Sequence, residues 1–145
     1  MTYNIYTEEQ IRKKYSDDKG GLSSGYYQAV QSNQSEISTF NNYRGTGECS
    51  IWLVSEFVYT ETFKEKEGFV KLADILGAKP QNAYDDYAIR LGDTAMYRYY
   101  DALKKMPADT LIVFSKAWIM GASSNADAYA EYKTLYQAMI GFSAP

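Results

Sequence analysis

Apolar residues recur every three or four positions along most of this chain, which is the spacing of amphipathic helices. The second half predicts three such helices, each with a beginning and an end that can be recognised. The first opens at a capping box formed by Thr62 and Glu65 and closes at Gly77. The second runs from 82 to 92 and the third from 93 to 106, and each carries its apolar residues on one side.

Three other segments of this half are also patterned. The apolar run 111–120 predicts a buried central helix, with a strand as the alternative. Tyrosine, methionine and isoleucine then recur at helical spacing, which predicts a last helix that opens at Ser124 and ends at Gly141. The segment 50–62 is rich in β-branched and aromatic residues that suit a strand, although several of them also share one helical face. We favour a helix there and keep the strand open.

The first 48 residues follow a different pattern. Thr7 and Gln10 form a capping box, which predicts a short helix from Glu8 to about Ser16. The stretch 26–40 has apolar residues at loose helical spacing, but its many serines and asparagines are weak helix formers. Residues 20–47 are rich in glycine, serine, asparagine, glutamine and tyrosine. This composition predicts an adaptable arm.

These patterns together predict one domain over residues 1–145, with an N-terminal arm at 1–48 and a helical body at 49–145. The fold class is mainly α: a compact helical domain of about five to seven helices with a Tyr/Ser/Gly/Asn-rich arm. The alternative is an α+β fold with a strand near 50–60 or 111–115. The two classes differ in whether the apolar runs pair with one another or pack as helices.

Composition narrows the range of functions. The chain of 145 residues has fifteen tyrosines, no histidine, one cysteine and a formal net charge of −3. Such a charge has the wrong sign for nucleic-acid binding, and we expect none that is direct. Cys49 cannot form an internal disulfide, and we find neither a signal peptide nor an apolar run of membrane-spanning length. We therefore expect a protein of the cytoplasm, or of a particle assembled inside the cell, that does not insert into membranes.

One stretch resembles a DNA-binding motif. Leu72–Ala78, followed by a predicted helix from about Asn82, resembles the first helix and turn of helix-turn-helix proteins. The resemblance implies a recognition helix that approaches phosphates and base edges. The predicted helix instead carries Asp85 and Asp86 near its start and has no basic residue before Arg90. We interpret this stretch as a structural turn between two helices.

No catalytic, cofactor-binding or metal-binding residue is predicted. Adjacent carboxylates on a helix point about 100° apart and do not converge on one ligand. Cys49 lacks a histidine base, and a lone Gly-x-Gly at 45–47 follows no convincing strand. An enzyme built from carboxylates and tyrosine is our third hypothesis. It requires two or more acids in one deep pocket with a tyrosine hydroxyl, drawn from Glu56, Asp74, Asp85, Asp86 and Asp101.

The tyrosines form two groups. Seven lie at helical spacing and are expected to face the core: Tyr84, Tyr87, Tyr99, Tyr100, Tyr129, Tyr132 and Tyr136. Six others lie in the weakly charged arm, whose composition is typical of protein contact surfaces, and are the predicted protein-binding residues: Tyr3, Tyr6, Tyr15, Tyr26, Tyr27 and Tyr43.

These observations predict a non-enzymatic protein that binds another protein or copies of itself. The first hypothesis is a structural or accessory subunit of a larger assembly. The alternative is a small inhibitor or immunity protein, of the kind that phages and mobile elements encode, which blocks a protein target. A subunit should copurify in fixed stoichiometry, whereas an inhibitor should be a free monomer or dimer.

Overall fold

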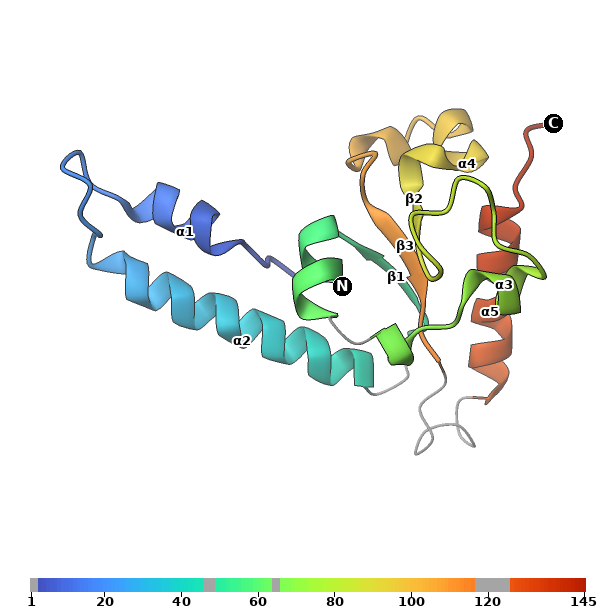
Figure 1. Cartoon of the computed structure of the whole chain (residues 1–145), viewed down its shortest axis with the longest axis horizontal. Coiled ribbons are helices and arrows are strands. Elements are labelled where there is room, and N and C mark those ends of the chain that lie inside the picture. The colour runs from blue at the N-terminus through green and yellow to red at the C-terminus, as the bar shows by residue number, and fades with distance from the viewer. Residues whose placement is uncertain (1–2, 46–48, 64–65, 117–125) are drawn as a thin grey trace. The chain divides into compact units, whose positions relative to one another are not determined.

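The computed structural model describes residues 3–45, 49–63, 66–116 and 126–145 (Figure 1). The chain divides into two compact units, Met1–Gly45 and Thr46–Pro145. Among the described residues, no helix combines the length and the apolar character that crossing a bilayer requires.

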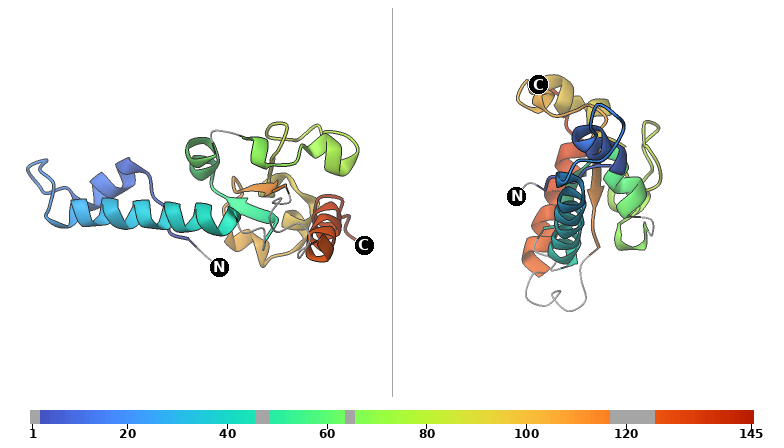
Figure 2. Two further views of the ribbon diagram at one scale, coloured as in Figure 1. Left: turned by 90° about the horizontal axis from the view of Figure 1, so that it is seen from below. Right: turned by 90° about the vertical axis from the view of Figure 1, so that its left-hand side faces the viewer.

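The N-terminal unit is a pair of helices, α1 (Glu8–Tyr15) and α2 (Gly25–Gly45), which Figure 2 shows side by side. The capping box is confirmed: the Gln10 amide N–H donates to Thr7 Oγ1 at 3.0 Å, and the Thr7 N–H donates to Gln10 Oε1 at 2.8 Å. The second predicted helix is also present and extends beyond 26–40 at both ends. Ile11 of α1 is buried, which fixes the side of α1 that faces α2.

The second unit contains a three-stranded antiparallel sheet, so the prediction of a mainly α fold is wrong. Its strands are β1 (Ile51–Val54), β2 (Ile89–Arg90) and β3 (Leu111–Phe114), in the order β1-β3-β2. The two segments left open as possible strands therefore both contain one, and they pair with each other, Ile51 opposite Phe114. The strands β1 and β3 are short apolar runs rich in β-branched and aromatic residues, and their pairing with each other outweighs their helical spacing.

Three α-helices complete this unit: α3 (Leu72–Leu76), α4 (Ala95–Tyr99) and α5 (Ala126–Ile140). A π-helical turn at Val58–Thr62 follows β1, and single 3₁₀ turns lie at Lys66–Gly68, Leu91–Asp93 and Leu103–Lys105. The last predicted helix is confirmed as α5. Its expected start at Ser124, the expected cap at Glu65 and the end of the apolar run at Met120 lie outside the described residues.

The three helices predicted between 62 and 106 are largely absent. The first is reduced to α3, which ends at Gly77 in the left-handed conformation at φ +85°. The second is a turn followed by β2, because the Asp85 carboxylate accepts the backbone N–H groups that a helix would have used. The third is broken into α4 and a 3₁₀ turn. Without a helix at 82–88, the resemblance to a helix-turn-helix ends at Gly77.

The core of this unit is built around β3, whose four side chains are all buried. Its alternate residues face opposite sides of the sheet. Ile112 and Phe114 belong to the cluster that includes Tyr136 of α5, and the Phe114 and Tyr136 rings lie 5.4 Å apart between centroids. The helix α5 thus covers one face of the sheet, as Figure 1 shows. Other buried members come from α3, β2 and α4: Leu72, Ile75, Ile89 and Met96.

Candidate functional site

The six predicted binding tyrosines all lie in the N-terminal unit, but they differ widely in exposure. Tyr6 is 49% exposed and Tyr27 is 72% exposed. Tyr26, the immediate neighbour of Tyr27, is buried at 7% because it lies on the side of α2 that faces α1. The other three, Tyr3, Tyr15 and Tyr43, are half-buried. The Tyr3 ring packs edge-on against Phe40. Only part of the set is therefore available for contact.

A groove of about 410 Å³ lies within this unit, between α1, α2 and the extended residues that precede α1. Two of the predicted tyrosines, Tyr6 and Tyr15, line it. Its other lining residues are mostly uncharged: Asn4, Gln10, Ile11, Gly25, Gln28, Ala29, Ser32 and Asn33, with Lys14 and Glu36 as the two charged members. The groove thus brings together residues that are up to 32 positions apart, from 4 to 36.

Two hydrogen bonds and one close contact fix the shape of the groove. The Tyr6 backbone N–H donates to Asn33 Oδ1 at 2.8 Å, and Asn33 Nδ2 donates back to the Tyr6 carbonyl at 3.0 Å. Through this reciprocal pair, the side-chain amide of Asn33 on α2 holds the backbone of the extended segment in place. At the other end, a side chain at Gly25 would place its Cβ 3.0 Å from the Tyr15 ring, so glycine permits the close approach.

The groove is close to neutral. Its one lysine and one glutamate balance each other, and the nearby Arg12 is already engaged. Arg12 forms an ion pair with Glu8 at 2.9 Å and lies 5.6 Å from the centre of the Tyr26 ring. The hydrogen bond to Glu8 raises the pKa of the Arg12 guanidinium. The groove therefore presents aromatic edges, amides and a small apolar floor, which suit a polypeptide segment better than a highly charged ligand.

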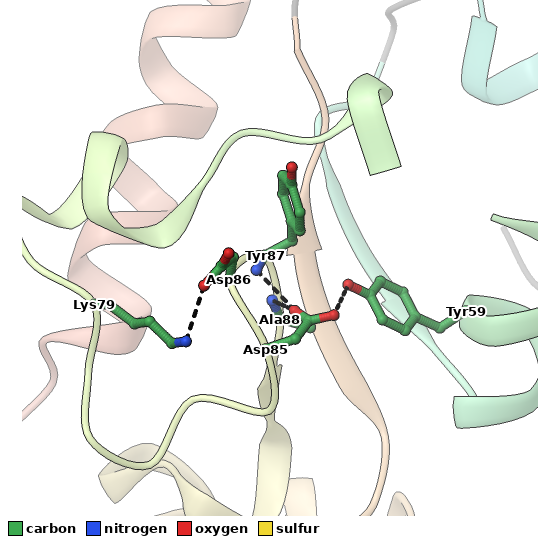
Figure 3. Close-up of polar contacts among 6 residues, drawn as sticks. All are labelled: Tyr59, Lys79, Asp85, Asp86, Tyr87 and Ala88. Carbon is green, nitrogen blue, oxygen red and sulfur yellow. Dashed lines mark hydrogen bonds and ion pairs between the residues drawn. The ribbon is translucent and has the colours of Figure 1, made fainter. Parts of the chain in front are cut away.

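The second unit holds a cluster of tyrosines and carboxylates that belongs to the enzyme hypothesis (Figure 3). The Tyr59 hydroxyl donates to Asp85 Oδ2 at 2.5 Å, and the other oxygen of Asp85 accepts the N–H groups of Tyr87 and Ala88 at 2.7 and 2.9 Å. Burial raises the pKa of the Tyr59 phenol above its ordinary range, and the bond to Asp85 raises it further. Both carboxylate oxygens of Asp85 are thus occupied.

A second tyrosine–carboxylate pair lies beside the first. The Tyr84 hydroxyl donates to Glu56 Oε1 at 2.8 Å, which raises the pKa of the Tyr84 phenol. The Tyr84 ring meets the Tyr59 ring edge-on, with centroids 5.9 Å apart, and carries the Arg90 guanidinium at 4.7 Å. Two of the five candidate acids, Glu56 and Asp85, therefore meet tyrosine hydroxyls of neighbouring rings.

A lysine lies over the Tyr59 ring. Lys66 Nζ donates to the Tyr59 carbonyl and lies 3.6 Å from the ring centre. Loss of hydration lowers the pKa of this ammonium group. Its position over an aromatic face and on a carbonyl is a stabilising contact for a cation. The amine has an aromatic ring and an oxygen acceptor as its partners, which tie the 3₁₀ turn at Lys66–Gly68 to the π-helical turn at Val58–Thr62.

The remaining candidate acids are not gathered with this pair. Asp86 is exposed and forms an ion pair with Lys79 at 2.9 Å, which lowers the pKa of its carboxyl. Asp101 is exposed and paired in the same way with Lys104 at 2.7 Å, and Asp74 is exposed on α3. Within the described ranges, no three Cys, Asp or Glu side chains lie close enough to hold a metal ion. The contacts of Asp85 and Glu56 join the helical turn that follows β1 to the segment 84–88.

Sequence reasoning missed an exposed aromatic group in the second unit. Tyr99 and Tyr100 were expected in the core but are 48% and 47% exposed. The centroids of their rings lie 4.9 Å apart, and the Phe142 ring centroid lies 5.5 Å from that of Tyr99 and 5.3 Å from that of Tyr100. The expectation rested on an unbroken helix from 93 to 106, whereas α4 ends at Tyr99 and turns this part of the chain outward. Of the seven tyrosines expected in the core, Tyr136 is fully buried.

No protein-family model matches the chain, and neither the curated proteins nor the solved structures contain a match to it.

Proposed function

We propose that this chain is a non-enzymatic protein-binding protein and that it holds a segment of its partner in the groove between α1 and α2. The observation that carries the proposal is the groove itself, whose volume of about 410 Å³ lies within the usual range of binding sites. Its lining includes tyrosine, serine, glycine and asparagine, the residues in which antibody contact surfaces are enriched.

Preorganisation of the groove supports the proposal. The capping box fixes the start of α1, and the Tyr6–Asn33 pair fixes the segment before it. Groups that are already ordered lose little entropy on binding, so more of the contact energy appears as affinity. The exposed ring of Tyr6 at the rim can act as an anchor, because tyrosine is among the residues that contribute most to protein interfaces.

Surface composition favours a blocking protein of the inhibitor or immunity kind over an assembly subunit. Obligate subunits bury large, markedly apolar faces. The large exposed hydrophobic residues in the described parts of the chain are four tyrosines and three leucines, distributed over both units: Tyr6, Leu22, Tyr27, Leu53, Tyr99, Tyr100 and Leu135. Such scattered, amphipathic residues suit a complex whose members also exist apart. The single cysteine fits a reducing compartment, so we propose that the complex forms in the cytoplasm.

Site-specific photo-crosslinking tests this proposal. A photoreactive phenylalanine analogue would replace Tyr6, at the rim of the groove, and in a separate variant Tyr99, which has nearly the same exposure in the other unit. We expect crosslinking in cells from position 6 to one discrete protein and not from position 99. Equal crosslinking from both positions, or from position 99 alone, would remove the groove as the binding site.

The native mass of the purified chain distinguishes the two kinds of binder. A free monomer or dimer that binds its target only when the target is added is the result expected of an inhibitor. Copurification in a large particle of fixed stoichiometry would instead establish the assembly subunit.

A further inference from the structure

In the part of the second unit that the structure describes, no strand pairs with the outer side of β1. The middle strand β3 is paired along both sides, with β1 on one side and β2 on the other. The outer side of β2 is occupied by the preceding turn, through the Ala83–Ile89 bridge and the bond from the Tyr84 N–H to the Ala88 carbonyl. Figure 1 shows β1 on the opposite side of β3 from β2.

The hydrogen-bond register shows which backbone groups of β1 point outward. The Ser115 N–H donates to the Ser50 carbonyl at 2.8 Å, so residues 50, 52 and 54 bond to β3. The N–H and C=O groups of Ile51 and Leu53 therefore point to the outer edge. Among the described residues, the one group that bonds there is Cys49 Sγ, which donates to the Ile51 carbonyl at 3.2 Å. A carbonyl oxygen can accept a second bond.

The sequence of this edge lacks the charges and prolines that often prevent strands from pairing. Residues 49–55 read Cys-Ser-Ile-Trp-Leu-Val-Ser and contain no charge, no proline and no glycine. Leu53 is 43% exposed. Natural proteins commonly protect open edges with lysine, proline or a bulge. An unprotected edge with outward donors and acceptors two residues apart is suited to accept another extended strand.

We propose that the occupant is the β1 strand of a second copy, paired antiparallel about a twofold axis beside Trp52. In this register Ile51 of each copy lies opposite Leu53 of the other, and the outward groups form four hydrogen bonds. The two copies would form one six-stranded sheet. Neutrality of the strand favours self-pairing, because a charged edge would repel its own copy.

The pairing is expected to be weak. A four-residue strand contributes few contacts, and the loss of rotational and translational freedom offsets much of their energy. The dimer should therefore depend on concentration, with a dissociation constant in the micromolar range or above. The proposal concerns the second unit alone and is independent of the groove in the first.

Sedimentation velocity from micromolar to millimolar concentration tests the pairing. We expect the mass of the wild-type chain to rise towards that of a dimer, and Leu53→Lys to remain a monomer throughout. Leu135→Lys is the matched control, because Leu135 is 50% exposed on α5. It should dimerise as the wild type does. A wild-type chain that stays monomeric, or a Leu53→Lys variant that dimerises equally well, would overturn the proposal.

Amide hydrogen exchange gives a readout that needs no variant. In the wild-type chain, exchange at the N–H groups of Ile51 and Leu53 should slow as concentration rises, while exchange at Gly77, far along the chain, stays constant. A dimer whose formation leaves both β1 amides unprotected would show that the contact lies elsewhere.

Discussion

Removal of one phenolic oxygen from each of two buried tyrosines should change the stability of the second unit in opposite directions. Tyr59 is 1% exposed and Tyr136 is 0% exposed, so both side chains are fully packed. They differ in what their hydroxyl groups bind. Tyr59 donates to the Asp85 carboxylate, whereas the Tyr136 hydroxyl has no hydrogen-bond partner among the described residues. The substitutions Tyr59→Phe and Tyr136→Phe make the same chemical change in these two settings.

The expected magnitude follows from hydrogen bonding. A buried hydroxyl without a partner costs about 1–3 kcal/mol in lost hydration. Tyr136→Phe removes that cost and should raise the free energy of unfolding by about 1–2 kcal/mol. A hydrogen bond to a charged group contributes about 1.5–3 kcal/mol. Tyr59→Phe removes such a bond and should lower the free energy of unfolding by about 2 kcal/mol.

Urea unfolding followed by tryptophan fluorescence measures both effects in the right part of the molecule. Both tryptophans, Trp52 and Trp118, belong to the second unit, so the signal does not report on α1 and α2. The wild-type chain and the two variants would be compared in one buffer at neutral pH. Changes of the same sign in the two variants, or a loss of stability above about 1 kcal/mol for Tyr136→Phe, would show that the hydrogen-bond partners of the two hydroxyl groups do not decide the effect.

Three further predictions concern stability. Asp85→Ala should lower the free energy of unfolding by about 3 kcal/mol in the same urea assay, because it leaves the Tyr59 hydroxyl and two backbone N–H groups without an acceptor. Asp86→Ala removes an exposed ion pair and should lower the free energy of unfolding by less than about 1 kcal/mol. Equal losses in the two variants would contradict this expectation. The pKa of Tyr59 is raised on folding. The Tyr59 hydroxyl therefore contributes fully to the free energy of unfolding below the unfolded pKa of 10.0, and this contribution falls as the pH rises beyond that value. The stability difference between the wild type and Tyr59→Phe, measured by urea unfolding from pH 8 upward, should therefore shrink above that value and not below it. Thr7→Ala removes half of the capping box and should destabilise α1 by about 1 kcal/mol, seen as a loss of helical circular dichroism on heating without a change in the tryptophan transition.

Local signals in the sequence identified the elements that depend on neighbouring residues. The capping box at Thr7 and Gln10 lies within four residues, and it predicted α1 correctly. The strands could not be found in the same way, because Ile51 and its partner Phe114 are far apart in the chain and each run is also compatible with a helix. The turn at Asp85 depends on its own side chain, which captures backbone N–H groups that the helical pattern assigned elsewhere.

The candidate site could be predicted in composition but not in geometry. The sequence placed contact tyrosines in the N-terminal residues, yet Tyr26 and Tyr27 have the same local context and differ from 7% to 72% in exposure. Their difference depends on which side of α2 the helix α1 covers. The pairing of Tyr6 with Asn33, 27 positions away, likewise has no local signal.

The affinity of the chain for the partner captured from position 6 is the most direct test of the groove as the binding site. Titration would compare the wild type with Tyr6→Ala and with Tyr99→Ala, two substitutions at nearly equal exposure, 49% and 48%. A tyrosine that anchors an interface contributes about 2 kcal/mol or more, so Tyr6→Ala should weaken binding by about 30-fold. Tyr99→Ala should leave the affinity within about twofold of the wild type. Unchanged affinity in Tyr6→Ala, or an equal loss in Tyr99→Ala, would show that the groove is not the binding site.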